Sequence, residues 1–203
     1  MRRIRDLSFD EIIEYNLREG GTEFTVFADT QTDRVNMARS LVAGCLDIVD
    51  AQNGWVGGRN IVELGCSAGD ILGVFSDVHE CYGYDVTPGA AEAARERYPN
   101  LTVIEAAVEN VEPHACDVLI LCEFLEHIVD PIELVKGWMP LARTVVIGHP
   151  LVADGDDPEP GHLWGYEPKD FEAWFPMGGH VRDEAYSFEM GYQMVIGRGH
   201  RAT

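Results

Sequence analysis

Two glycines and one acidic residue stand where the chain could hold a ribose-containing ligand. The segment IVELGCSAGD at residues 61–70 is an apolar run that ends in a turn containing Gly65 and Gly69. A second apolar run ends at Asp85, at about the 20-residue spacing of a nucleotide-binding βαβ unit. Glycines let the backbone approach a ligand closely, and a carboxylate at the end of the next strand can accept hydrogen bonds from ribose hydroxyls. The pattern predicts a cofactor with an adenosine-like ribose.

The turn does not fit a dinucleotide cofactor. The fingerprint G-x-G-x-x-G/A, counted from Gly65, would need glycine at Ser67 and glycine or alanine at Asp70, so these two positions fail. A different pattern, E/D-x-G-x-G-x-G, is met at Glu63, Gly65 and Gly69, with the small residue Ser67 in the middle.

Together with the GYD that ends at Asp85, this turn resembles motifs I and II of the class I S-adenosylmethionine-dependent methyltransferases. The resemblance implies S-adenosylmethionine as the cofactor. It places Glu63, Gly65 and Cys66 at the methionine end and Asp85 at the ribose. The cofactor site that it implies comprises Glu63, Gly65, Cys66, Ser67, Gly69, Asp85, Val86, Ala107, Cys122 and Glu123.

Residues that follow the apolar run CDVLILC are the candidates for catalysis. EFLEHIVDP, which begins at Glu123, resembles the LEH-x-x-DP signature of the subgroup that includes the ubiquinone and menaquinone biosynthesis methyltransferases, and the stretch from His162 resembles an element that covers the acceptor there. Methyl transfer needs an aligned acceptor and removal of its proton, a task that suits histidine. We expect His127 to be the base, with Glu126 and His162 as the other catalytic candidates. That His127 only caps and orients its loop stays an open alternative.

A metal-dependent alternative uses the same residues. Glu123, Glu126, His127 and His162 also resemble the E-x-x-E-H…H arrangement of the family that methylates the terminal 2′-hydroxyl of small RNAs, where these side chains hold a divalent metal. Such a cation would help to deprotonate a hydroxyl. The high acidic charge and the DP pair favour metal-independent transfer to oxygen or nitrogen of a small molecule. A non-catalytic domain that only binds S-adenosylmethionine is a third alternative.

Charge and cysteine usage restrict partners and compartment. The 203 residues carry 15 Lys and Arg against 35 Asp and Glu, a formal charge of −20, which disfavours nucleic acid as a partner. The five cysteines form no C-x-x-C pair, and no segment has the roughly 18 uninterrupted apolar residues of a membrane span. We expect a cytoplasmic protein without membrane contact that acts on a small-molecule acceptor. The sequence does not indicate the oligomeric state.

The order of apolar runs predicts the elements that position these residues. From residue 60, predicted strands alternate with helices begun near Asp70, by Thr87-Pro88 and by Asp130-Pro131. This indicates an α/β fold with a Rossmann-like, doubly wound and mostly parallel sheet. The last two runs, separated by Gly191, predict a C-terminal antiparallel hairpin. We expect one domain over 1–203, with an N-terminal helical lid at 1–56 and the cofactor-binding and catalytic core at 57–203.

Overall fold

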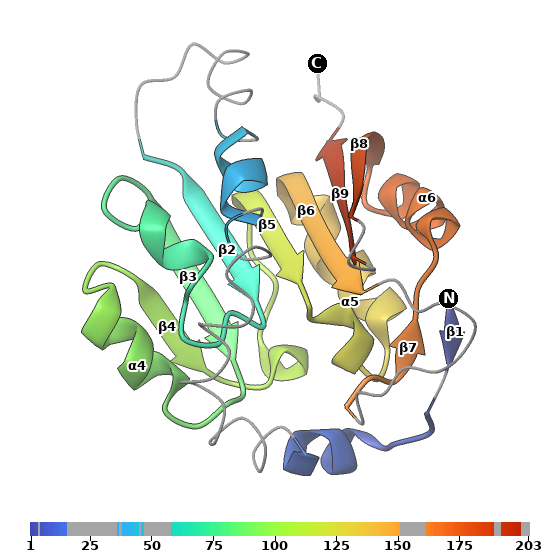
Figure 1. Ribbon diagram of the computed structural model, residues 1–203, viewed down its shortest axis with the longest axis horizontal. Coiled ribbons are helices and arrows are strands. Elements are labelled where there is room, and N and C mark those ends of the chain that lie inside the picture. Colours follow the sequence, from blue (N-terminus) through green and yellow to red (C-terminus); the bar gives the residue numbers. More distant parts are fainter. Residues whose placement is uncertain are drawn as a thin grey trace.

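A seven-stranded sheet of order β4-β3-β2-β5-β6-β9-β8 organises the protein (Figure 1). The structure is a computed structural model, and it describes residues 1–3, 5–15, 36, 38–44, 46, 58–150, 161–188 and 192–199. A second sheet pairs only the short strands β1 and β7. The strands are β1 Arg2–Arg3, β2 Asn60–Leu64, β3 Glu80–Asp85, β4 Thr102–Glu105, β5 Cys116–Cys122, β6 Ala142–Pro150, β7 Trp164–Gly165, β8 His180–Phe188 and β9 Tyr192–Gly199.

Strand direction confirms the predicted fold class. β4, β3, β2, β5 and β6 are parallel to their neighbours, and β9 and β8 then extend the sheet as the predicted antiparallel hairpin. From β2 the chain first builds outward through β3 and β4, and it then crosses to the other side of β2 to form β5. Strand order therefore reverses between β2 and β5, and a doubly wound sheet binds its ligand beyond the carboxyl ends at such a point.

Apolar cores cover both faces of the sheet. The central strands are therefore buried on both sides, and their sequences are nearly continuous apolar runs. Alternate residues of β5 point to opposite faces, so Leu119 and Leu121 join one cluster and Val118 and Ile120 join the other. Helices α5 and α6 pack in the first cluster, and α4 packs in the second together with a helix from the N-terminal region. The result is a helix–sheet–helix arrangement.

One helix after β2 is shorter than the sequence predicts. The helices of this part are η1 Leu72–Phe75, α4 Ala90–Arg97, η2 Val108–Asn110, η3 Leu125–His127, α5 Pro131–Trp138, η4 Met139–Leu141 and α6 Pro168–Met177. The helix predicted to begin near Asp70 is only the short 3-10 helix η1. The Tyr98 ring packs so closely on Gly73 that an added Cβ would lie 2.3 Å from it.

Two predicted helix starts have different outcomes. Asp130 caps α5 as predicted, because its Oδ1 accepts a hydrogen bond from the Glu133 backbone N–H at 3.1 Å. The prediction that Thr87-Pro88 begins helix α4 is wrong. The cap of α4 is Gly89, whose φ of 80° places it in the left-handed region that glycine adopts easily.

The described N-terminal residues form two helical stretches. Residues 9–15 are helical, and the backbone N–H of Ser8 at their start donates to Glu11 Oε2 at 2.8 Å. In the second stretch, residues 36, 38–44 and 46 are described and helical, and their apolar side chains pack in one of the two sheet cores. The rest of the predicted lid at 1–56 lies outside the described residues, and its covering role stays a prediction. No helix among the described residues is long and apolar enough to cross a membrane.

Candidate active site

The glycine turn and the EFLEHIVDP segment meet at the carboxyl edge of the sheet. β2 and β5 are parallel neighbours, with Glu63 in register with Ile120, so the loops that follow them leave the sheet at the same edge. The Phe124 ring lies directly on Gly65, where an added Cβ would be 2.5 Å from Phe124 Cδ2. Glycine is therefore required at residue 65 both by its φ of 75° and by this contact.

Hydrogen bonds to the end of β3 hold the glycine turn. The backbone N–H groups of Gly65 and Cys66 donate to the Tyr84 carbonyl at 2.8 and 3.2 Å, and that of Gly69 donates to the Cys66 carbonyl at 2.8 Å. Ser67, which replaces the middle glycine of the motif, has a φ of 48°. A side chain in the left-handed region is unfavourable, so the turn keeps glycine-like geometry at a residue that is not glycine.

Asp85 fastens the turn to the neighbouring strand end. Its two carboxylate oxygens accept hydrogen bonds from the backbone N–H groups of Ser67 and Thr87, both at 2.7 Å. An ionised carboxylate has about four acceptor positions, so these two bonds leave capacity for ribose hydroxyls. Val86 directly follows β3 and Ala107 follows β4, which places both at the same sheet edge as Asp85.

Glu63 presents a buried carboxyl beneath the turn. Its side chain is only 2% exposed; one oxygen accepts a hydrogen bond from the Leu72 backbone, while Oε2 has no hydrogen-bond partner in the described part of the chain. Burial raises the pKa of this carboxyl well above its ordinary value of 4.5, and Asp85 and Asp70 add to the effect. An unpartnered buried acceptor costs free energy, and the ammonium group at the methionine end of S-adenosylmethionine would satisfy it. The residues of the turn therefore fit this cofactor.

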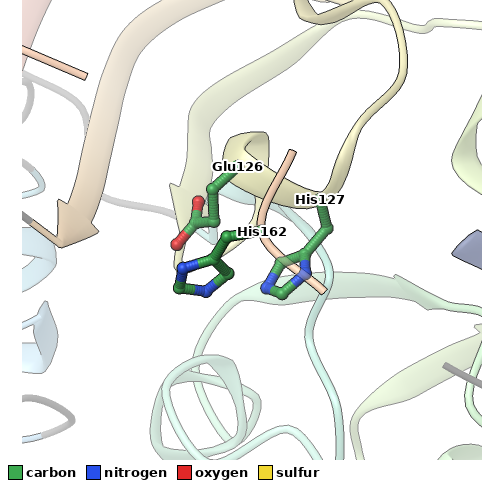
Figure 2. Close-up of side chains that lie close together, drawn as sticks. All are labelled: Glu126, His127 and His162. Carbon is green, nitrogen blue, oxygen red and sulfur yellow. The ribbon is translucent and has the colours of Figure 1, made fainter. Parts of the chain in front are cut away.

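Three side chains after β5 and before β7 converge on one point. Figure 2 shows Glu126, His127 and His162 together, and one ligand-type atom from each lies within 4.8 Å of the others. The two imidazole rings are 4.7 Å apart between centroids, at an angle of 71°. The Glu126 side chain is fully buried, whereas both histidines are partly exposed. The three predicted catalytic residues thus form one cluster.

Backbone contacts hold this cluster together. His127 Nδ1 lies 3.1 Å from the Gly161 carbonyl, which can only accept, so Nδ1 carries the proton and Nε2 is the basic atom. The Leu163 N–H donates to the Glu126 carbonyl at 2.7 Å, which joins the two segments.

The remaining two predicted residues border the cluster without entering it. Glu123, with a φ of 50°, is not among the three described side chains that converge, and its backbone N–H donates to the Gly148 carbonyl at 2.9 Å. Cys122 is buried, and burial raises the pKa of its thiol well above the ordinary value of 9.0. The thiol therefore stays protonated and unreactive.

Sequence reasoning missed three residues of the N-terminal region that reach the site. Arg39 donates through Nε to the Asp70 carbonyl at 2.7 Å, beside the glycine turn. Arg5 donates through Nη1 to the His162 carbonyl at 2.9 Å. The Tyr15 ring packs on Gly161, where an added Cβ would lie 2.5 Å from Tyr15 Cε1. No motif marks these side chains, because each acts on backbone far away in sequence.

Comparisons with known proteins agree with this geometry. Residues 62–143 match the family model described as a methyltransferase domain. The structure resembles magnesium protoporphyrin IX methyltransferase from Synechocystis PCC 6803 with bound S-adenosylhomocysteine (TM-score 0.66, 14% identity, covering 97% of this chain and 89% of that chain). It also resembles a TehB-like S-adenosylmethionine-dependent methyltransferase from Corynebacterium glutamicum (TM-score 0.55, 16% identity, covering 84% and 98%). No curated protein matches the sequence significantly.

At these identities the structural likenesses show the fold, and the family match adds a methyltransferase domain over residues 62–143. The matched residues 62–143 contain the glycine turn, Asp85 and the Glu126-His127 pair. The match favours an enzyme over a domain that only binds the cofactor. Residues 62–143 accordingly match a methyltransferase domain, and the chain has the fold of the S-adenosylmethionine-dependent methyltransferases that it resembles.

Proposed function

We propose that this enzyme transfers the methyl group of S-adenosylmethionine to an oxygen or nitrogen of a small-molecule acceptor, with His127 as the general base. The observation that carries the proposal is the convergence of Glu126, His127 and His162 at the sheet edge that also holds the glycine turn. A base at this edge lies on the side of the sheet where a doubly wound fold binds its ligands.

Each residue has a defined task in this proposal. S-adenosylmethionine, when bound, supplies a methyl group on a positively charged sulfur that is open to in-line displacement. Glu63 and Asp85 hold its two ends, and the Nε2 atom of His127 accepts the proton of the acceptor hydroxyl or ammonium. The Glu126 carboxylate, buried beside the imidazoles, stabilises the positive charge that His127 gains.

Charge and cysteine chemistry support the small-molecule acceptor and the cytoplasmic location that we propose. A chain with a formal charge of −20 repels the phosphate backbone of nucleic acids. The four described cysteines, Cys66, Cys81, Cys116 and Cys122, are buried free thiols, as in proteins of reducing compartments.

Single histidine substitutions test this role. We expect His127→Ala to lower turnover about 10²- to 10⁴-fold, the range for losing a general base, with cofactor affinity changed by a few-fold at most. The assay is release of S-adenosylhomocysteine in the presence of metabolite pools and, in parallel, small-RNA pools. His79→Ala is the control, because His79 precedes β3 at the opposite, amino edge of the sheet. Full turnover by the His127 variant would reduce this residue to a structural role.

A metal-assisted transfer is the second candidate, and the same cluster favours it. Two imidazoles and one carboxylate are a common ligand set for Zn²⁺ and other divalent transition metals. Metal–ligand bonds are about 2.0–2.2 Å long, so the ligand atoms of Glu126, His127 and His162, which now lie within 4.8 Å of one another, would have to move closer together through side-chain rotations. The Gly161 carbonyl already orients His127 through Nδ1, as an outer partner of a metal-bound histidine does. A bound cation would lower the pKa of an acceptor hydroxyl, including the terminal 2′-hydroxyl of an RNA.

Chelation separates the two candidates. For metal-independent transfer we expect EDTA to leave turnover within about two-fold, because general-base catalysis by His127 needs no cation. Activity lost in EDTA and restored by Zn²⁺, Mn²⁺ or Mg²⁺ would instead establish the metal-assisted reaction. Cofactor affinity, measured by calorimetry in both conditions, is the control that the protein remains folded.

A further inference from the structure

The first residues of the chain lie along the segment that carries His162. β1 pairs antiparallel with β7, with Arg3 opposite Trp164, and the Arg5 backbone N–H donates to the Leu163 carbonyl at 3.4 Å. The Arg3 guanidinium also sits over the Trp164 ring, 5.3 Å from its centroid. We name residues 1–3 and 5 the N-terminal strap.

The strap contacts one side of this segment and the loop after β5 contacts the other. On the loop side, Leu163 donates to the Glu126 carbonyl, and Trp164 Nε1 donates to the Ile128 carbonyl at 2.7 Å. The Gly161 carbonyl faces His127 Nδ1. Residues 161–164 are therefore held between two backbone segments that are distant in sequence.

Arg5 supplies the side-chain contact at His162 itself. His162 lies in neither a helix nor a strand, and its carbonyl accepts a hydrogen bond from Arg5 Nη1 at 2.9 Å across 157 residues of sequence. A charged donor makes such a bond stronger than a neutral one. The guanidinium thereby fixes the backbone from which the His162 imidazole projects toward His127.

We propose that Arg5 is a positioning residue that keeps the His162 imidazole against His127 and Glu126. The inference rests on the proposed function of this cluster for its consequence in catalysis. A displacement of about 1 Å at a catalytic group can lower a rate on the order of 100-fold, so the anchoring of His162 bears directly on turnover. In this role Arg5 acts through the backbone of His162, and it takes no part in the chemistry.

The test compares Arg5→Met with Arg5→Lys by NMR of the full-length protein. In the wild type, the 4.7 Å ring separation predicts a nuclear Overhauser contact between the ring protons of His127 and His162. We expect Arg5→Met to lose this contact and to speed hydrogen exchange of the Leu163 amide about 10-fold or more. Arg5→Lys keeps a charged donor and should restore both readouts in part.

Two controls keep the result specific. Arg143→Met removes an exposed arginine whose ion pair with Asp117 lies away from the cluster, and it should leave both readouts unchanged. Affinity for S-adenosylhomocysteine, measured by calorimetry, should change less than about two-fold in Arg5→Met, because the cofactor turn is held by other contacts.

Three outcomes would overturn the proposal. These are an unchanged ring contact with unchanged Leu163 exchange in Arg5→Met, loss of cofactor binding in parallel with a general loss of folding, and no recovery in Arg5→Lys. The NMR readouts need no acceptor, so they stand apart from the test of the proposed function. If the Arg5 variants give the expected NMR results while His127→Ala keeps full turnover, Arg5 positions His162 but His127 is not the base.

Discussion

The buried carboxyl of Glu63 allows a sharp test of how the cofactor is held. Burial raises its pKa, so the carboxyl keeps its proton to a higher pH than an exposed glutamate does. An ammonium group placed against Oε2 favours the ionised form. Binding at a pH below the raised pKa must therefore release a proton from Glu63. We expect calorimetry at about pH 6, in buffers of different ionisation enthalpy, to detect release of up to about one proton per site.

The Glu63→Gln variant removes both the charge and the proton release. A hydrogen bond to a charged group contributes about 1.5–3 kcal/mol, so we expect cofactor affinity to fall about 10- to 150-fold. The amide of glutamine retains an oxygen for the Leu72 N–H, which limits disturbance of the turn. Glu80→Gln is the matched control, since Glu80 is an exposed glutamate at the opposite end of the neighbouring strand. Wild-type binding without proton release, or a Glu63→Gln affinity within about two-fold, would refute the assignment.

The same carboxyl predicts a pH dependence of stability without ligand. Between the unfolded value near 4.5 and the raised folded pKa, the native state binds more protons at Glu63 than the unfolded state does. The contribution of Glu63 to stability is therefore present below pH 4.5 and is lost as pH rises through this window. We expect the free energy of unfolding of Glu63→Gln, relative to wild type, to increase from pH 5 to pH 8 in urea titrations. Within this window the increase should be about 1.4 kcal/mol for each pH unit.

Two further predictions concern the turn above Glu63. Asp85→Asn should weaken cofactor binding by about 1–3 kcal/mol in calorimetry, because the ribose hydroxyls and the Ser67 and Thr87 N–H groups lose a charged acceptor. Unchanged affinity would mean that the ribose lies elsewhere. Ser67→Gly should leave the free energy of unfolding unchanged or raise it by up to about 1 kcal/mol in urea titrations, since glycine relieves the left-handed strain at φ 48°. A loss of more than about 1 kcal/mol would show that the serine side chain stabilises the turn.

Strands in the centre of the sheet could be predicted from sequence because they are buried on both faces. The run at 116–122 has one polar residue, Asp117, and the run at 60–64 has two, Asn60 and Glu63; the structure gives β5 and β2 those same bounds. The Asp130-Pro131 helix start was equally readable, since a capping carboxylate and a first-turn proline act locally. These features depend on residues that are close together in the sequence, so they can be predicted from it.

Features that depend on tertiary contact could not be read in this way. The chain after Asp70 has apolar residues at helical spacing, yet the fit of the Tyr98 ring on Gly73 accompanies only a short 3-10 helix. At the level of sequence, only the resemblance to the metal-dependent RNA methyltransferase family brings His127 and His162 together. Their approach to 4.7 Å across 34 intervening positions depends on the loops that join β5 to β7, and no spacing rule predicts it.

The N-terminal region gains a structural role from two arginines that the sequence did not mark. In-line methyl transfer requires the cofactor half and the acceptor half of the site to be aligned, and the two segments that we propose for these halves, the glycine turn and the histidine segment, are loops whose carbonyls need hydrogen-bond donors. Arg39 donates to the Asp70 carbonyl on the cofactor half, and Arg5 donates to the His162 carbonyl on the histidine half. Both residues precede β2, so one region of the chain fixes the two loops relative to the sheet. Through these two hydrogen bonds, the described residues of the region hold the loops of the site in place, and this role does not depend on whether the region also covers the site.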